Sequence, residues 1–314
     1  MNCLVTGASG FIGSSLTKRL VKEGYSVKAL IHKNKPKSFE KDIQYITGDI
    51  TDPSSLKTAV ENVDLIFHCA AFVRDFGPKD VFYKINYEGT KNIVDACKEQ
   101  KIKRFIFLGH VRYESVKKFS YYTFSKEMAE QFLLDTHKND NFPVVVIRPG
   151  NVYGPGLATW VIRPLKAIQK NRISLINNGN GIFHHTYIDN LLDAILVAIK
   201  EPKAIGEIID ITDGDHSTTW GQYLNDLAEM TGKSPIKKNM SKNTALALGN
   251  VTMLLYNTLR IKPWFTPMAV EVFTNQKRIS IKKAESLLGY KPKIDYKEGM
   301  KRVENWLKTE GHIT

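Results

Sequence analysis

MNCLVTGASGFIG, residues 1–13, joins a short apolar run to three glycines in a GxxGxxG spacing. The run 2–6 is typical of a buried strand, and the glycines open an amphipathic helix that continues through Lys22. Such glycines permit a tight turn and a close approach of the backbone to a pyrophosphate, while the helix N-terminus offers free N–H groups. The segment predicts a dinucleotide site that includes Gly7, Ser9, Gly10, Phe11, Ile12 and Gly13.

Apolar runs alternate with amphipathic stretches through the first half of the chain. This order predicts an α/β fold, a doubly wound parallel sheet of the Rossmann type with helices on both faces. We expect the sheet domain to comprise residues 1–155 and 186–212, and a smaller substrate-binding lobe to comprise 156–185 and 213–314. The expected strands are Asn2–Thr6, Ser26–His32, Ile43–Thr47, Asp64–Cys69, Arg104–Gly109, Val144–Arg148 and Glu207–Thr212.

The composition is that of an ordinary globular protein, with 314 residues, 42% hydrophobic and 25% charged. No basic region or cleavage site precedes the first strand, so we expect a cytoplasmic location. The three cysteines have no CxxC spacing, so we expect buried thiols and no metal site. Although the net charge is +13, the lysines are dispersed and no nucleic-acid-binding motif is present, so we expect no nucleic-acid partner.

No run of 18 apolar residues occurs, which argues against a membrane-spanning helix. The nearest approach is TALALGNVTMLLYNTL, residues 244–259, which Gly249, Asn250 and Asn257 interrupt. We expect a helix packed in the second lobe, with peripheral membrane contact as the alternative.

The second expected strand bears on the choice of cofactor. In dinucleotide sites an Asp or Glu about 20 residues past the glycines binds the 2′-hydroxyl of NAD. Here the segment YSVKALIHKNKPK carries His32 and Lys33 at that point. A 2′-phosphate would meet positive charge, which favours NADP over the alternative, NAD. An exposed basic loop is the other interpretation.

Several further motifs, in order, resemble the extended short-chain dehydrogenase/reductase family along almost the whole chain. They are TGASGFIG (6–13), GDITDP (48–53), HCAA (68–71), INYEGTKNIVDAC (85–97), RPGNVYGPG (148–156) and YIDN (187–190). SYYTFSK (120–126) and residues 206–232 look most like the 3β-hydroxysteroid and sterol-4-carboxylate dehydrogenase branch. The resemblance implies further cofactor contacts at Asp49, Ile50, Ala70, Ala71, Asn86, Pro149 and Val152.

Tyr122 and Lys126 stand at i and i+4 of a helix expected to begin near Phe119, so they share one face. A nearby ammonium group would stabilise a phenolate and could bind the nicotinamide ribose. The family resemblance implies an acid/base role for Tyr122 and a supporting role for Lys126. Both residues are therefore expected to contact cofactor as well. Tyr121 is a poorer candidate, because the lysine lies off its face.

The fifth strand departs from the family pattern, in which a Ser/Thr pair binds the reacting oxygen. Gly109 and His110 stand there instead. We expect His110 to replace the serine, titrating between about pH 6 and pH 8 as imidazoles do. The alternatives are a loop hydroxyl, from Ser115, Ser120 or Thr123, or a catalytically weak protein.

These features predict hydride transfer between NADP(H) and a secondary alcohol or ketone of an apolar, steroid-like or isoprenoid-like small molecule. Residues 174–190 contain no arginine, which weighs against a nucleotide-sugar ligand. The alternatives are a nucleotide-sugar epimerase or dehydratase with bound NAD, and a non-catalytic NADP-binding regulator. His184 and His185 either line the substrate crevice or form a loop pair. The resemblance also implies a homodimer formed by helices around Tyr83–Glu99 and Phe119–His137.

Overall fold

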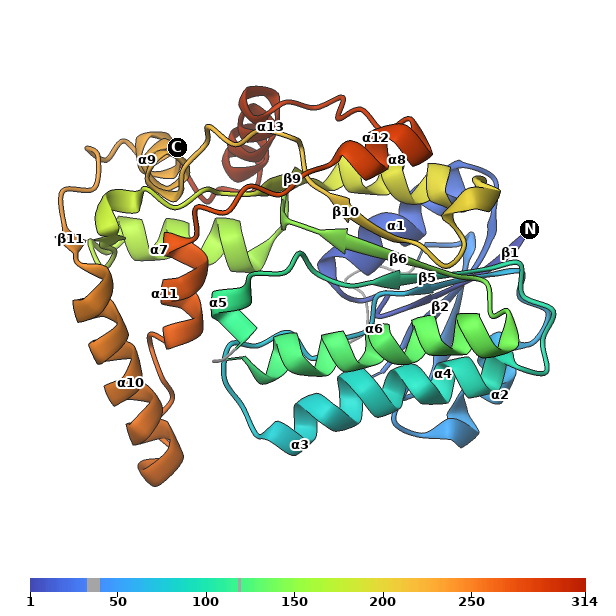
Figure 1. Cartoon of the computed structure of the whole chain (residues 1–314). Helices are drawn as coiled ribbons and strands as arrows, with labels where there is room; N and C mark the ends of the chain where they lie inside the picture. The colour runs from blue at the N-terminus through green and yellow to red at the C-terminus, as the bar shows by residue number, and fades with distance from the viewer. Residues whose placement is uncertain (33–39, 118–119) are drawn as a thin grey trace.

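The computed structural model describes residues 1–32, 40–117 and 120–314. Its centre is a parallel seven-stranded sheet in the order β10-β6-β5-β4-β1-β2-β3 (Figure 1). The predicted fold class is confirmed, and every expected strand is present with ends shifted by no more than one residue. The strands are β1 (Asn2–Thr6), β2 (Ser26–Ile31), β3 (Ile43–Thr47), β4 (Leu65–His68), β5 (Arg104–Leu108), β6 (Val144–Pro149) and β10 (Ile208–Ile211).

The sheet buries both faces, and successive side chains of each strand enter opposite cores. In β1, Cys3 and Val5 belong to one core and Leu4 to the other. The first core is covered by α1 (Phe11–Lys22) and α8 (Ile188–Ala198). The second core is covered by α2 (Lys57–Val60), α4 (Gly89–Cys97) and α6 (Tyr121–Asp140). Because both faces are apolar, the strands read as continuous apolar runs in the sequence.

Two helical segments near the strand ends carry predicted site residues. α3 (Lys79–Phe82), the π-helical turn η2 (Tyr83–Glu88) and α4 follow one another without a break. α6 begins at Tyr121, slightly later than expected, because the Ser120 hydroxyl accepts a hydrogen bond from the Thr123 N–H at 3.0 Å and caps the helix. Phe119 lies outside the described residues.

Further elements lie beyond the carboxyl ends of β5 and β6, most of them in the residues expected to form the second lobe (Figure 1). They include α5 (Glu114–Lys117), α7 (Arg163–Gln169), α9 (Trp220–Met230), α10 (Lys242–Leu259), α11 (Pro267–Thr274) and α13 (Tyr296–Thr309). Two short parallel pairs join β7 (Asn151–Tyr153) to β9 (His185–Tyr187), and β8 (Leu175–Ile176) to β11 (Asn239–Met240). α12 (Lys282–Leu288) packs on α8 and β10. The proposed division into two lobes stays a prediction.

Short 3-10 turns complete the chain: η1 (Pro53–Ser55), η4 (Asn177–Gly179) and η5 (Pro202–Ala204), with a second π-helical turn, η3 (Ala158–Ile162). Among the described residues, no helix combines the length and the apolar character that crossing a bilayer requires.

Candidate active site

The turn after β1 is built so closely that side chains would not fit. Gly7 has φ +67°, and a Cβ on it would lie 2.7 Å from the Ala70 backbone nitrogen. A Cβ on Gly13 would overlap the carbonyl oxygen of Gly7. The glycines therefore let α1 start directly against the ends of β1 and β4.

The N-terminus of α1 offers the hydrogen-bond donors that a pyrophosphate needs. Gly10 is the N-cap residue and makes no side-chain cap bond, and the first turn holds no acidic residue. Ser9 and Gly10 are exposed, while Phe11 and Ile12 are half-buried. This arrangement fits a dinucleotide, whose phosphates would take the free N–H groups at the positive end of the helix dipole.

Asp49 and Ile50, which are expected to contact the cofactor, follow β3. Burial acts to raise the pKa of Asp49, but the N–H and hydroxyl of Thr51 and the nearby His32 bring it below its ordinary value. His32 Nε2 lies 3.2 Å from Asp49 Oδ2. Ile50 is buried in the second core, where it packs against Gly89. Lys33 lies outside the described residues.

The loop after β4 is held by the buried His68, the first residue of the HCAA motif. His68 Nδ1 lies 2.8 Å from the Thr6 hydroxyl, and its Nε2 lies 3.0 Å from the Thr90 hydroxyl. Burial lowers the pKa of His68 to about 3, so the ring is neutral. The Thr6 hydroxyl also accepts the Ala70 N–H at 3.2 Å. The ring thus joins β1, β4 and α4 beneath the cofactor turn.

Asn86 holds the same loop from the other side. Its Oδ1 accepts the Phe72 N–H at 2.7 Å, and its Nδ2 donates to Ser125 Oγ at 2.9 Å. The side chain therefore connects the segment containing the half-buried Ala71 to α6, one residue before Lys126. In this structure its polar atoms position protein segments, and direct contact with cofactor stays a prediction.

Pro149 and Val152 lie at the end of β6 and in β7. The Pro149 carbonyl accepts the Val111 N–H at 3.1 Å, and the Val152 side chain is buried in the first core. The two residues therefore hold the strand ends together beside the loop that leads to Tyr122.

Tyr122 faces inward at the start of α6, whereas its neighbour Tyr121 is exposed. The rings of Tyr122 and His110 lie 5.1 Å apart between centroids. Burial raises the pKa of Tyr122 to about 12. The structure thus brings the predicted acid/base residue and the predicted serine replacement together at the end of β5.

Lys126 is buried on the same face of α6, with its Nζ 3.8 Å from the centre of the Phe107 ring. Burial lowers its pKa to about 7, against the opposing influence of Cys69 and Glu130. The amino group of Lys126 therefore lies between α6 and β5, over the ring of Phe107.

His110 is neutral rather than a group that titrates near pH 7. Burial, followed by the positive charges of Lys126, Arg148 and Arg112, lowers its pKa to about 3. The expectation that it titrates between about pH 6 and pH 8 is therefore wrong. Its Nε2 is buried without a hydrogen-bond partner in the described part of the protein, so the ring has a polar atom free for a ligand.

The alternative hydroxyls differ in their freedom. Ser120 Oγ is engaged as the α6 cap. Thr123 Oγ1 is buried and has no hydrogen-bond partner among the described residues, and Ser115 is half-buried in α5. His110 and Thr123 therefore offer uncommitted polar atoms, while Ser120 does not.

A buried ion network explains the glycine at position 109. Glu130 of α6 accepts Arg148 Nε at 2.8 Å and Arg112 Nη2 at 2.5 Å. A Cβ on Gly109 would come within 3.1 Å of Arg148 Cγ, so glycine leaves room for that arginine. The network connects the loop that carries His110 to α6, and local sequence patterns gave no sign of it.

His184 and His185 are both buried, and side chains hold them. His185 Nδ1 lies 2.8 Å from Asp213 Oδ2 and its Nε2 lies 3.2 Å from Asp215 Oδ2. His184 Nδ1 lies 3.1 Å from the hydroxyl of Tyr113. His185 belongs to β9, which pairs with β7 and not with the main sheet.

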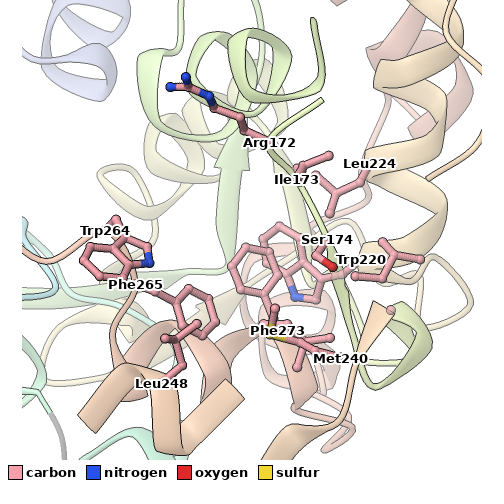
Figure 2. Close-up of a pocket in the computed structure, with 13 residues that line it drawn as sticks. Arg172, Ile173, Ser174, Trp220, Leu224, Met240, Leu248, Trp264, Phe265 and Phe273 are labelled. Atoms are coloured by element: carbon pink, nitrogen blue, oxygen red, sulfur yellow. The ribbon is translucent and has the colours of Figure 1, made fainter. Parts of the chain in front are cut away.

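The residues expected to form the second lobe enclose a cavity of about 330 Å³ with an aromatic lining (Figure 2). Arg172 is the single charged residue among the described residues that line it, and it stands at one edge in Figure 2. The apolar side chains that line the cavity include those of Ile173, Leu224, Met240, Leu248 and Phe273. Trp220, Trp264 and Phe265 also contribute to this lining.

Comparison with known proteins identifies the family. A model of the NAD dependent epimerase/dehydratase family matches residues 3–212. The chain belongs to that family. The matched region contains the glycine turn, the Tyr122/Lys126 pair and the strands between them.

Two curated relatives of this family member are oxidoreductases. "Sterol-4-alpha-carboxylate 3-dehydrogenase, decarboxylating" from Mus musculus is 27% identical, over 96% of this chain and 89% of the relative. "2-alkyl-3-oxoalkanoate reductase" from Stenotrophomonas maltophilia is 28% identical, over 97% of this chain and 98% of the relative. The resemblance to the hydroxysteroid and sterol dehydrogenase branch, and the class of NAD(P)-dependent oxidoreductase, are confirmed.

A solved structure supports the same fold. The UDP-glucuronic acid 4-epimerase from Bacillus cereus in complex with NAD aligns with a TM-score of 0.77 and 24% identity. The alignment covers 98% of this chain and 99% of that one. At this identity the likeness establishes the family fold.

Proposed function

We propose that this oxidoreductase transfers a hydride between NADP(H) and a secondary alcohol or ketone of an apolar or amphipathic small molecule. The aromatic cavity of the second lobe supports the substrate class, although none of the residues that line it belongs to the Tyr122/Lys126 site. Its lining suits an apolar body, and its single cation, Arg172, suits an anionic edge of the ligand. The names of the two relatives also describe molecules with an apolar part and a carboxylate.

We assign the proton transfer to Tyr122. In reduction the phenol donates its proton to the substrate oxygen, and in oxidation the phenolate accepts it. The neutral His110 donates a hydrogen bond to that oxygen, with Thr123 as the alternative donor. Lys126 holds the nicotinamide ribose and offsets negative charge on the phenol oxygen. The bound nicotinamide supplies or accepts the hydride.

We infer a preference for NADP from the end of β2. No carboxylate follows Ile31 directly, and the nearby Asp49 is engaged by Thr51 and paired with His32. Titration of the protein with NADPH and NADH tests this preference. Tighter binding of NADPH supports it, and equal or tighter binding of NADH contradicts it. Lys33→Glu should invert the preference if that side chain contacts the 2′-phosphate.

A substrate panel tests the reaction itself. The wild-type protein is mixed with NADPH and either apolar ketones or nucleotide sugars, and nicotinamide absorbance is followed. Consumption of NADPH with an apolar ketone supports the proposal. Conversion of a nucleotide sugar without net cofactor consumption identifies an epimerase or dehydratase instead. Cofactor binding with no turnover on any substrate identifies a regulator.

We also propose a homodimer in the cytoplasm. η2, α4 and α6 pack beside one another on one face of the sheet domain. Tyr121 and Phe124 at the start of α6 are exposed apolar side chains that a partner subunit would cover.

A further inference from the structure

One edge of the aromatic cavity presents free positive charge. The Arg172 side chain is exposed, and its guanidinium forms no hydrogen bond or ion pair within the described part of the chain. The Lys238 amino group lies nearby, because it donates a hydrogen bond to the carbonyl of Asn171 at 3.1 Å. We call this border of the cavity the Arg172 edge. A guanidinium without a partner is suited to a carboxylate, which can accept two hydrogen bonds from it.

The walls behind the Arg172 edge suit an aliphatic chain. The rings of Trp220 and Phe273 lie 4.4 Å apart between centroids, and the Trp220 indole N–H donates to the Val272 carbonyl at 3.2 Å. No acidic side chain occurs among the lining residues that the structure describes. Methylene groups gain free energy by leaving water for such walls, whereas the base and sugar of a nucleotide would find few hydrogen-bonding side chains there.

Another border of the cavity faces the loop that follows β4. Trp264 lines the cavity at a place apart from Arg172 (Figure 2). Two residues further along the chain, Thr266 donates a hydrogen bond to Asp75 Oδ2 of that loop at 3.0 Å. Val73 and Trp264 are both exposed apolar residues, each two positions from one end of this bond. An apolar molecule that leaves the cavity here would therefore pass apolar side chains.

The same loop leads to the start of α6. The rings of Phe72 and Phe82 lie 4.9 Å apart, and those of Phe82 and Tyr121 lie 6.3 Å apart, between centroids. Tyr121 directly precedes the proposed proton donor, Tyr122. A path of contacts thus connects the cavity to the reaction site, with the Arg172 edge at another border of the cavity.

The cations that act on His110 are already committed. Lys126, Arg148 and Arg112 are the positive charges that, after burial, lower the pKa of His110. Glu130 accepts hydrogen bonds from both arginines, and Lys126 is proposed to hold the nicotinamide ribose. A carboxylate beside the reacting carbon would have to compete with Glu130 or with the cofactor. A carboxylate at the Arg172 edge has no such competitor among the described lining residues.

We propose that the substrate is an elongated oxo acid, or the corresponding hydroxy acid, with its carboxylate at the far end of an aliphatic chain from the reacting carbon. The carboxylate binds Arg172, the chain occupies the cavity and passes Trp264, and the ketone reaches Tyr122. Reduction moves a hydride from NADPH to the carbonyl carbon and the Tyr122 proton to its oxygen, and the carboxylate is unchanged. This substrate class rests on the proposed function, because it requires hydride transfer beside Tyr122.

Dodecanoate has no ketone, so its binding tests the cavity apart from the reaction. We expect calorimetry to detect binding by the wild-type protein, and Arg172→Gln to weaken that binding by about tenfold or more because a charge-assisted pair is lost. Leu248→Trp, which fills part of the cavity, should weaken it as well. Arg163→Gln is the matched control and should keep wild-type affinity, because Arg163 is an exposed arginine of α7 outside the cavity lining.

Two series of oxo acids of graded chain length test where the carboxylate lies. In one series the ketone is at the penultimate carbon of the chain, and in the other it is β to the carboxylate. With NADPH, the best penultimate-oxo acid should have a kcat/KM about tenfold or more above that of the best β-oxo acid. Arg172→Gln should raise KM for the penultimate-oxo acids about tenfold and change kcat little, because the contact is distant from the reacting carbon. Methyl ketones without a carboxylate should be insensitive to Arg172→Gln.

The two measurements separate the ways in which the proposal can fail. Equal dodecanoate binding by wild type and Arg172→Gln, or no binding by wild type, would overturn the carboxylate site. Preference for β-oxo acids, with kinetics that Arg172→Gln leaves unchanged, would place the carboxylate beside the reacting carbon instead. Binding of dodecanoate that depends on Arg172, without reduction of any ketone, would refute the proposed function itself.

Discussion

At the scale of single residues, burial acts on Tyr122 and Lys126 in opposite directions. It raises the phenol pKa to about 12 and lowers the ammonium pKa to about 7. A neutral phenol suits donation of a proton to a ketone oxygen. A nearby anionic ligand stabilises the protonated form of Lys126. We therefore expect a bound dinucleotide to raise the pKa of Lys126.

Replacing Tyr122 by phenylalanine separates chemistry from binding. Tyr122→Phe should lower kcat by about 100-fold or more, because it removes a positioned proton donor, while cofactor affinity stays near the wild-type value. Lys126→Met should damage both quantities. Steady-state kinetics and cofactor titration provide the measurements, and full activity of Tyr122→Phe on a verified substrate would exclude the proposed acid/base role.

Comparing variants of His110, Thr123 and Ser115 identifies the group that replaces the family serine. His110→Ala should lower turnover, and His110→Asn, which keeps a neutral donor, should restore part of it. Because the pKa of His110 is about 3, neither change should move an inflection of the pH profile near pH 7. If His110→Ala behaves like wild type while Thr123→Ala or Ser115→Ala is impaired, a hydroxyl fills that place.

At the scale of elements, the β1–α1 turn depends on Gly13. Gly13→Val should abolish cofactor binding, because the new side chain would overlap the Gly7 carbonyl and push α1 away from the pyrophosphate site. Gly10→Ala should have a smaller effect, since its Cβ would meet the same oxygen at 3.2 Å. Calorimetric titration and circular dichroism distinguish lost binding from lost fold. A folded Gly13→Val variant of normal affinity would place the cofactor elsewhere.

His68 makes the junction of β1, β4 and α4 sensitive to acid. Its pKa falls from 6.5 to about 3 on folding, so its share of stability is present above about pH 6.5 and is lost as pH falls toward 3. Between about pH 7 and pH 5 this share amounts to about 2 kcal/mol. His68→Gln should lose correspondingly less free energy of unfolding over that interval. Equal losses in both proteins, measured with denaturant, would show that His68 is protonated in the native state.

The sequence alone predicted the features that depend on a local pattern of residues. Apolar runs predicted all seven strands, and the i, i+4 spacing placed Tyr122 and Lys126 on one face of a helix. It did not predict side-chain contacts between residues that are distant in the chain. The ion pairs of Glu130 with Arg148 and Arg112, and the bonds of His68 to Thr6 and Thr90, depend on how separate elements meet. For the same reason, the neutral state of His110 could not be foreseen, because burial sets it.

At the scale of the whole molecule, the exposed start of α6 bears on assembly. Phe124→Glu should convert a homodimer to a monomer, because it places a charge in the proposed contact between α6 helices. Val197→Glu on α8 is the control and should leave the dimer intact. Light scattering after size-exclusion chromatography measures the mass, and a monomeric wild-type protein would refute the dimer.

In the proposed reaction, the glycine turn binds the cofactor, α6 supplies the proton and the second lobe binds the apolar ketone. Isotope transfer tests this reaction most directly. The wild-type protein and Tyr122→Phe are incubated with an apolar ketone and NADPH in which deuterium replaces both hydrogens on the reactive carbon of the nicotinamide. We expect the wild type to place deuterium on the new carbinol carbon of the product and Tyr122→Phe to do so at least about 100-fold more slowly. Reduction without deuterium in the product, or equal transfer by both proteins, would contradict the proposed mechanism.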